Sequence, residues 1–163
     1  MTVTVQTALS EVQASARRLR EAARELVLTA VEDQPRNCQA HLIAIVHDAA
    51  LRAAGEAEQA DAAVHPEQGP AGGAPQAIAR CQHHVTLLGA ALVHELAAPE
   101  LLNDLAALAR ERGGEVSAWV REIFRRIDDC QIALWTDVQP ALLGYWQELA
   151  GLTSRICPPG DAA

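Results

Sequence analysis

The residues best suited to bind a metal are two cysteine–histidine pairs of equal spacing, Cys38-x-x-His41 and Cys81-x-x-His84. Residues i and i+3 of a helix face the same way, so together the pairs offer the two thiolates and two imidazoles that tetrahedral zinc binds. In an antiparallel hairpin, however, they would lie roughly 28 Å apart, at about 1.5 Å per residue. Only an intermolecular site would join them, so we expect core thiols, flanking histidines and no metal.

A second pattern, Arg36-Asn37-Cys38-Gln39-Ala40-His41, places an arginine five residues before a histidine. It resembles the Arg-x4-His motif of HEPN ribonucleases, which are helical-bundle proteins that cleave RNA at a dimer interface. The resemblance covers six residues, and it implies that His41 is the acid–base group and that Arg36 stabilises negative charge developing on the phosphate. In that family the motif usually lies on a late helix, whereas here it opens the second. A HEPN-like, metal-independent ribonuclease is the alternative function.

Other catalytic motifs are missing from the sequence. It contains no Gly-x-x-x-x-Gly-Lys phosphate loop, no Gly-x-Ser-x-Gly nucleophile turn and no Gly-x-Gly-x-x-Gly dinucleotide motif. No Glu-x-x-His pair has the inward phase that a ferritin-like iron site needs. Four widely spaced cysteines, three of them in apolar helical phases, predict free, buried and unreactive thiols. We therefore expect no cofactor, and no catalytic residue outside the alternative pair Arg36 and His41.

Composition and charge restrict the class of protein. The 163 residues suit one domain, and 33 alanines against five aromatic residues favour closely packed helices over a β-sandwich. A net charge of −8 provides no basic surface for nucleic acid, which is not expected as a partner except under the ribonuclease alternative. No uninterrupted apolar segment of membrane-spanning length occurs, and residues 1–6 do not resemble a signal peptide, so the expected location is the cytoplasm.

The first half of the chain has helical periodicity. Apolar residues recur at alternating steps of four and three: Val5, Leu9, Val12, Ala16, Leu19, Ala23, Leu26 and Ala30. This spacing predicts one long amphipathic helix that ends before Pro35. A second helix is expected over about residues 36–63, with a nearly all-Ala and Glu second half. The three prolines and three glycines of residues 64–75 predict a flexible loop.

The second half is more interrupted. A third helix is predicted through Leu96, and Pro99 either kinks it or begins a short successor that ends at Gly113-Gly114. A further helix starts at about Glu115, Pro140 is expected to bend it, and residues 157–163 should fray. The sequence thus predicts an all-α fold, an antiparallel bundle of about four principal helices in a single domain over residues 1–156.

The aromatic residues point to a partner. All five lie in the last third of the chain, and on a helical wheel Phe124 and Trp135 fall roughly 140–160° from Trp119, outside the core sector. Together with Ile132 and Val138 they would form an exposed apolar patch, and Trp is a residue that dominates interfaces. We therefore expect a non-enzymatic interaction or adaptor protein, a subunit of a homo- or hetero-oligomer, whose partner-binding residues are these four. A central helix surrounded by Ala-lined neighbours is the structural alternative.

Overall fold

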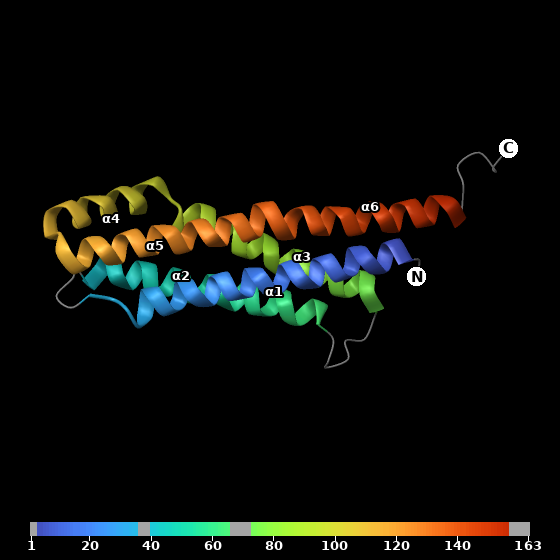
Figure 1. The fold of residues 1–163 in the computed structure, drawn as a ribbon, viewed down its shortest axis with the longest axis horizontal. Coiled ribbons are helices and arrows are strands. Elements are labelled where there is room, and N and C mark those ends of the chain that lie inside the picture. Colours follow the sequence, from blue (N-terminus) through green and yellow to red (C-terminus); the bar gives the residue numbers. More distant parts are fainter. Residues whose placement is uncertain (1–2, 36–39, 66–72, 157–163) are drawn as a thin grey trace.

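The computed structural model describes residues 3–35, 40–65 and 73–156, which contain helices and no strand (Figure 1). The all-α prediction is therefore confirmed. The segments, in chain order, are α1 (Val3–Val31), α2 (Ala40–Val64), α3 (Gly73–Ala91), η1 (Leu92–Leu96), α4 (Pro99–Arg112), α5 (Gly114–Ile132), η2 (Ala133–Val138) and α6 (Gln139–Ile156), where η marks a π-helix. The tail 157–163 and most of the predicted loop, residues 66–72, lie outside the described residues.

The helices form an elongated bundle in which α1 makes the most extensive contacts. It packs against α2 on one side and against α5, η2 and α6 on the other, while α3 packs against α2. Figure 1 shows α5, η2 and α6 as one nearly continuous rod along the whole molecule, with α4 beside α5 at one end. Short α4 therefore covers only part of the rod, and the part formed by η2 and α6 has no such cover.

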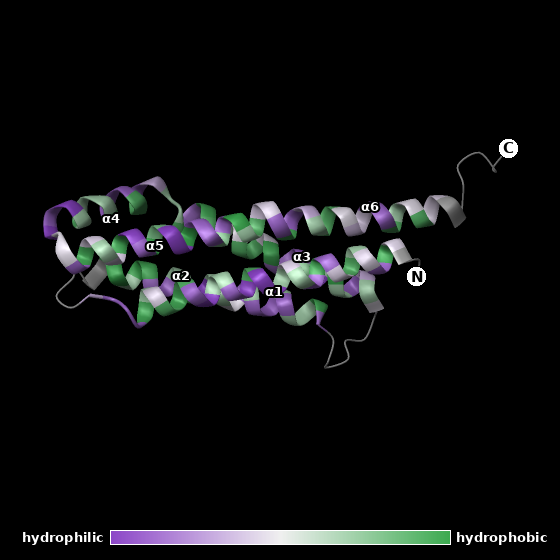
Figure 2. Ribbon diagram, in the orientation of Figure 1, coloured by the Kyte–Doolittle hydropathy of each residue, from purple (hydrophilic) through white to green (hydrophobic). Residues whose placement is uncertain are grey.

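The core is built from the predicted stripes. Every α1 position in the predicted stripe except Leu9 is buried, and these residues meet the alanine row of α2 at Ala49, Ala53, Ala57 and Ala60, all 0–1% exposed. Small side chains let α1 and α2 approach closely, and burying apolar surface stabilises the fold by about 25 cal/mol per Å². In Figure 2 hydrophobic positions recur along the helices between polar ones, as this one-sided burial requires.

Each π-helix ends shortly before a proline, η1 before Pro99 and η2 before Pro140. The N–H of Ala97 donates to the carbonyl of Leu92, five residues back, and that of Gln139 donates to Leu134 in the same way. A proline ring collides with the carbonyl four residues earlier, and for Pro99 and Pro140 that carbonyl lies inside the wider π turn. The predicted bend at Pro140 is replaced by η2, and the helix continues into α6.

The turns on either side of α4 agree with the sequence prediction. Ala98 is extended, Pro99 occupies the first turn of α4, and the axis turns by 48° relative to α3 and η1. At the other end Gly113 and Gly114 have φ angles of +63° and +51°, a backbone region that favours glycine. The chain therefore reverses there, and α5 runs back beside α4.

Among the described helices, none is both long and apolar enough to cross a membrane by itself. The helix from Gly73 to Leu96, taken together with the bent segment Pro99–Arg112, meets that length and composition test as a pair.

Candidate protein-binding surface

The most exposed aromatic side chain in the described part of the protein is Trp135, in η2, with 49% of its surface exposed. Its ring lies over Gly89 of α3: a Cβ atom added to Gly89 would stand 3.5 Å from Cη2 of the indole. That distance is an ordinary van der Waals contact, so the indole lies beside the α3 backbone at this position. One side of the ring is thus supported by protein, and the other faces water.

The π turn explains why Val138 lies in the core, although it follows the exposed Trp135 by only three residues. A π turn holds about one residue more than an α turn, so the residues after it are set back by roughly one 100° step. Val138 is thereby rotated into the core, where it is fully buried. Its predicted place in the exposed patch is corrected accordingly.

The other two predicted partner-binding residues behave differently from each other. Ile132 is 50% exposed and lies one turn before Trp135 on the same rod. Phe124 is half-buried against the hydrophobic core, more than two turns further back. The structure thus keeps Ile132 beside Trp135 and places Phe124 at the edge of the core.

The α3 helix supplies a second row of residues beside this rod. Gly89 contacts Trp135, and the side chain of Gln82 accepts a hydrogen bond of 2.8 Å from the indole N–H of Trp146. These two contacts show that α3 and the rod run antiparallel. Gln82, Gly89 and Val93 follow each other at helical spacing on this flank of α3, and Val93 is 46% exposed. The register therefore places Val93 toward Ile132.

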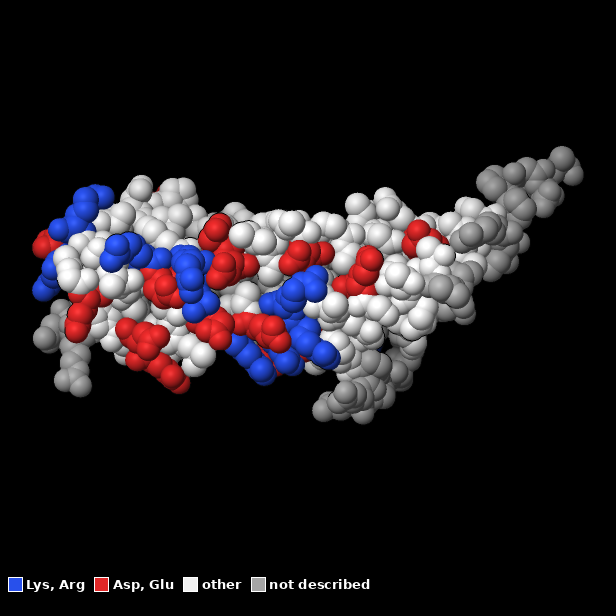
Figure 3. Space-filling model, viewed as in Figure 1, with Lys and Arg blue, Asp and Glu red and all other residues white. Residues whose placement is uncertain are grey.

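Leu143 of α6, 58% exposed, continues the row along the rod. We call the set Val93, Ile132, Trp135 and Leu143 the Trp135 surface. The residues between and beside them on the two flanks are uncharged: Gln82, Thr86, Gly89, Gln139 and Trp146. Figure 3 shows the charged side chains gathered over one half and the middle of the visible face, with few over α6. A charge-free apolar strip is thus present on a chain of net charge −8.

The three tryptophans differ in what their N–H groups do. Trp119 donates to the carbonyl of Thr29 at 2.9 Å and is 4% exposed, and Trp146 donates to Gln82. The N–H of Trp135 has no hydrogen-bond partner among the described residues. Tryptophans that are enriched at interfaces present this combination of apolar ring and available donor. Trp135 therefore differs from the other two in having unused binding capacity.

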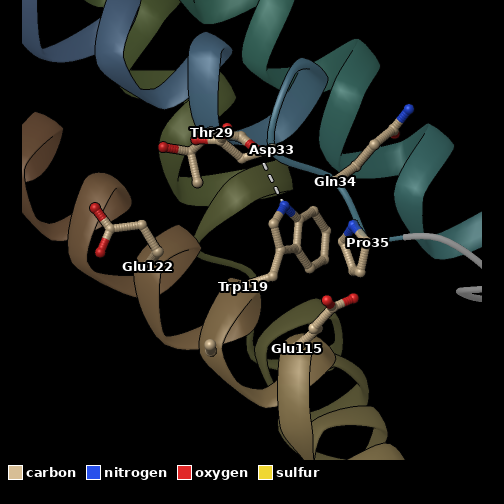
Figure 4. A pocket seen from close by; sticks show the side chains of 8 residues that line it. Thr29, Asp33, Gln34, Pro35, Glu115, Trp119 and Glu122 are labelled. Atoms are coloured by element: carbon tan, nitrogen blue, oxygen red, sulfur yellow. Dashed lines mark hydrogen bonds between the residues drawn. The ribbon is translucent and has the colours of Figure 1, made fainter.

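A second candidate is a depression of about 600 Å³ where α1 ends beside the start of α5 (Figure 4). Figure 4 shows Asp33, Glu115 and Glu122 around the ring of Trp119, whose N–H points to Thr29. Glu122 is paired with two arginines of its own helix. The hydrogen bond and burial of Trp119 fasten α5 to the end of α1. These observations give the depression a structural role.

The thiols that could act chemically are buried. Burial, with a smaller contribution from the charge of Asp61, raises the pKa of the Cys81 thiol to about 12. Burial, reinforced by Asp129, raises the pKa of Cys130 to the same value. A thiolate is the reactive and metal-binding form, so both side chains are inert at neutral pH. His84, the partner of Cys81 in the predicted pair, is held by Glu56 at 2.6 Å.

Two predicted features cannot be placed. Arg36 and Cys38 lie outside the described residues, and His41 lies in the first turn of α2 but its side chain is outside the described part. The ribonuclease pair and the first Cys-x-x-His pair therefore stay predictions. Among the described residues, no group of three or more His, Cys, Asp or Glu side chains is arranged to hold a metal ion.

A buried ionic cluster between α1 and α2 was not predicted from the sequence. Asp61 is 3% exposed, with Arg20 at 2.6 Å and His65 at 2.7 Å from its carboxylate oxygens. The available signal was the position of Asp61, directly after Ala60 in the buried alanine row. The cluster joins the two helices, since buried charges are tolerated only when paired.

Comparison with known proteins assigns no family to this chain. No protein-family model matches the chain, and neither the curated proteins nor the solved structures contain a match.

Proposed function

We propose that the protein is a non-enzymatic helical-bundle module, a subunit of an oligomeric assembly, and that it binds a protein partner through the Trp135 surface. The observation that carries this proposal is the half-exposed indole of Trp135, fixed on Gly89 with its N–H unused, in the middle of a charge-free strip. Binding at such a surface removes apolar area from water and gives the N–H a partner.

The strip has the composition of an interface centre. Such centres are depleted in charge and enriched in tryptophan, and a few well-packed aromatic residues supply most of the binding energy. Trp135 is suited to that role because its contact with Gly89 already restricts the ring. Less side-chain freedom is then lost on binding, which favours affinity.

The chemistry of the described side chains supports a binding role over catalysis. Cys81 and Cys130 have pKa values raised to about 12, which removes them as nucleophiles at neutral pH. Both are free thiols, which suits a reducing compartment, and we place the protein in the cytoplasm on that basis. The ribonuclease hypothesis remains as the alternative. It is removed if the purified protein leaves varied RNAs uncut.

The proposal can be tested with a photo-crosslinking amino acid, p-benzoylphenylalanine, placed at position 132 in cells that make the protein. We expect a specific covalent adduct with a protein, identified by mass spectrometry. The matched control places the same group at Leu28, which is similarly exposed but lies on α1. An adduct at 132 that the Trp135→Gln substitution removes supports the proposal, and equal labelling from 28 and 132 contradicts it.

A further inference from the structure

We propose that the partner covering the Trp135 surface is a second copy of this chain, paired about a two-fold axis that passes near Gln139. This inference rests on the proposed binding role of the surface and names its occupant. Most soluble oligomers are homo-oligomers with closed symmetry, and two-fold dimers are the commonest of them. The residues of the strip satisfy the particular conditions that such pairing imposes.

Charge is the first condition. Two chains of net charge −8 repel each other overall, so a patch that presents no charge is where they meet with the least repulsion. The strip from Ile132 to Trp146 is roughly 20 Å long at about 1.5 Å per residue, which exceeds the screening length of about 8 Å at physiological salt. A basic partner would instead be selected by the acidic parts of the surface. The strip offers such a partner no carboxylate.

Self-complementarity is the second condition. In a two-fold interface the same patch is used twice, so that residue i meets residue j and j meets i. With antiparallel α6 helices and the axis near Gln139, Trp135 of each copy lies opposite Leu143 of the other. Trp135 and Leu143, two of the three exposed large apolar residues of the rod, are thereby paired.

The same register keeps Asp128 of one copy away from Asp128 of the other. Asp128 is the first exposed carboxylate before the strip, and the pairing places it opposite Ala150 of the second copy. Ile132 lies opposite Trp146 of the second copy, so the next pair from Asp128 toward the axis is an apolar contact. At the axis the two Gln139 amides meet, and an amide can both donate to and accept from an identical amide.

The register is tested by disulfide formation across the axis. In a chain carrying Cys38→Ser and Cys157→Ser, Gln139→Cys should form a disulfide-linked dimer of twice the 17.4 kDa chain mass under mild oxidation. Only a residue close to the axis meets its own copy at disulfide distance. Thr136→Cys is the matched control, because it is exposed on the same rod but lines the depression facing α1. It should form no disulfide-linked dimer.

Sedimentation equilibrium of the unmodified chain supplies the second measurement. We expect a monomer–dimer equilibrium, and Trp135→Gln should weaken the dimer by at least about tenfold, since truncating a hot-spot aromatic costs this much or more. Circular dichroism of the variant should keep the helical signal. A chain that stays monomeric at high concentration, or equal cross-linking of Gln139→Cys and Thr136→Cys, overturns the inference.

The mass of the adduct formed from position 132 in cells separates this inference from the proposed function. An adduct with another copy of the chain supports both. If the adduct contains a different protein, the surface is a binding site but its occupant is not a second copy. If position 132 gives no adduct beyond that of Leu28, the proposed function fails as well.

Discussion

Trp119 and Trp135 lie on one continuous rod but in contrasting surroundings. Trp119 is buried at the charged end of the bundle, under three carboxylates, and its N–H is bonded to the end of α1. Trp135 is half-exposed in a charge-free stretch, with α3 under one side of its ring and no partner for its N–H among the described residues. Trp119 is satisfied by contacts within the chain, whereas the side chain of Trp135 is 49% exposed to solvent.

The two sites differ in the helices that pack beside the rod and in the rotation of the side chains about its axis. Short α4 packs beside α5, whereas α3 lies beside η2 and α6, where Gly89 and Gln82 meet Trp135 and Trp146. The π turn before Pro140 then shifts the residues of η2 relative to the core, burying Val138 while Trp135 stays outside. A helix can thus supply a structural tryptophan and a binding tryptophan from the same periodic pattern.

The largest expected effect is the difference between the two tryptophans in the free energy of unfolding lost when each is replaced. Trp119→Ala removes a buried ring and its hydrogen bond to Thr29, and should lower the free energy of unfolding by about 3–5 kcal/mol. Trp135→Ala, measured in dilute protein, should cost less than about 1 kcal/mol, as is usual for surface positions. Urea unfolding checks both variants. Similar losses for the two would place Trp135 in the monomer core and remove the contrast.

The stability of the α1–α2 interface should depend on the buried ion pair of Arg20 and Asp61. Asp61→Ala leaves Arg20 without its buried partner and should destabilise the fold by about 3 kcal/mol. Replacing both residues by apolar ones, Arg20→Met with Asp61→Leu, should recover most of that loss. Thermal unfolding of the two variants provides the measurement. A double variant as unstable as Asp61→Ala would show that the cluster does more than satisfy its own charges.

Alkaline pH should affect the core and leave the Trp135 surface unchanged. Above about pH 9 the thiols of Cys81 and Cys130 ionise in the unfolded chain but keep their protons in the folded one up to about pH 12. The unfolded state then binds fewer protons, so the free energy of unfolding falls as the pH rises through this window. The slope approaches about 1.4 kcal/mol per pH unit for each thiol.

Urea unfolding at pH 8 and at pH 10.5 measures this loss of stability. The double variant Cys81→Ala with Cys130→Ala should lose much of the pH dependence. The Trp135 surface contains no titratable side chain, so the effect of Trp135→Gln on association should be the same at both pH values. A pH-independent stability of the unmodified protein would contradict the burial of the thiols.

The smallest expected effect is a gain. The hydroxyl of Tyr145, in α6, is buried and has no hydrogen-bond partner in the described part of the chain, a state that costs free energy. Tyr145→Phe removes the unpaired group and should stabilise the fold by about 1 kcal/mol. The shift of the urea midpoint tests this. A destabilised variant would reveal a partner for the hydroxyl, such as a buried water.

The sequence predicts the helices and their ends better than it predicts which side chains are exposed. The 4-3 spacing of α1, the start of α4 at Pro99 and the stop at Gly113 are confirmed, because periodicity, proline and glycine act locally. Val138 is misplaced because the sequence assigns it to the exposed patch from its nearness to Trp135, without the π turn that contains both residues. Asp61 is missed because the partner that permits its burial, Arg20, lies on another helix. The first error arises from local helix geometry and the second from a contact between two helices.

Solvent access to the three tryptophans tests the central claim most directly. Hydroxyl-radical labelling followed by mass spectrometry should oxidise Trp135 in dilute protein while Trp119 stays protected. In concentrated protein, and in cells that make it, Trp135 should become protected as well, and this protection should disappear when Leu143→Gln disturbs the same surface. Equal oxidation of Trp135 under all three conditions would show that nothing covers this surface, and would contradict its role as a binding site.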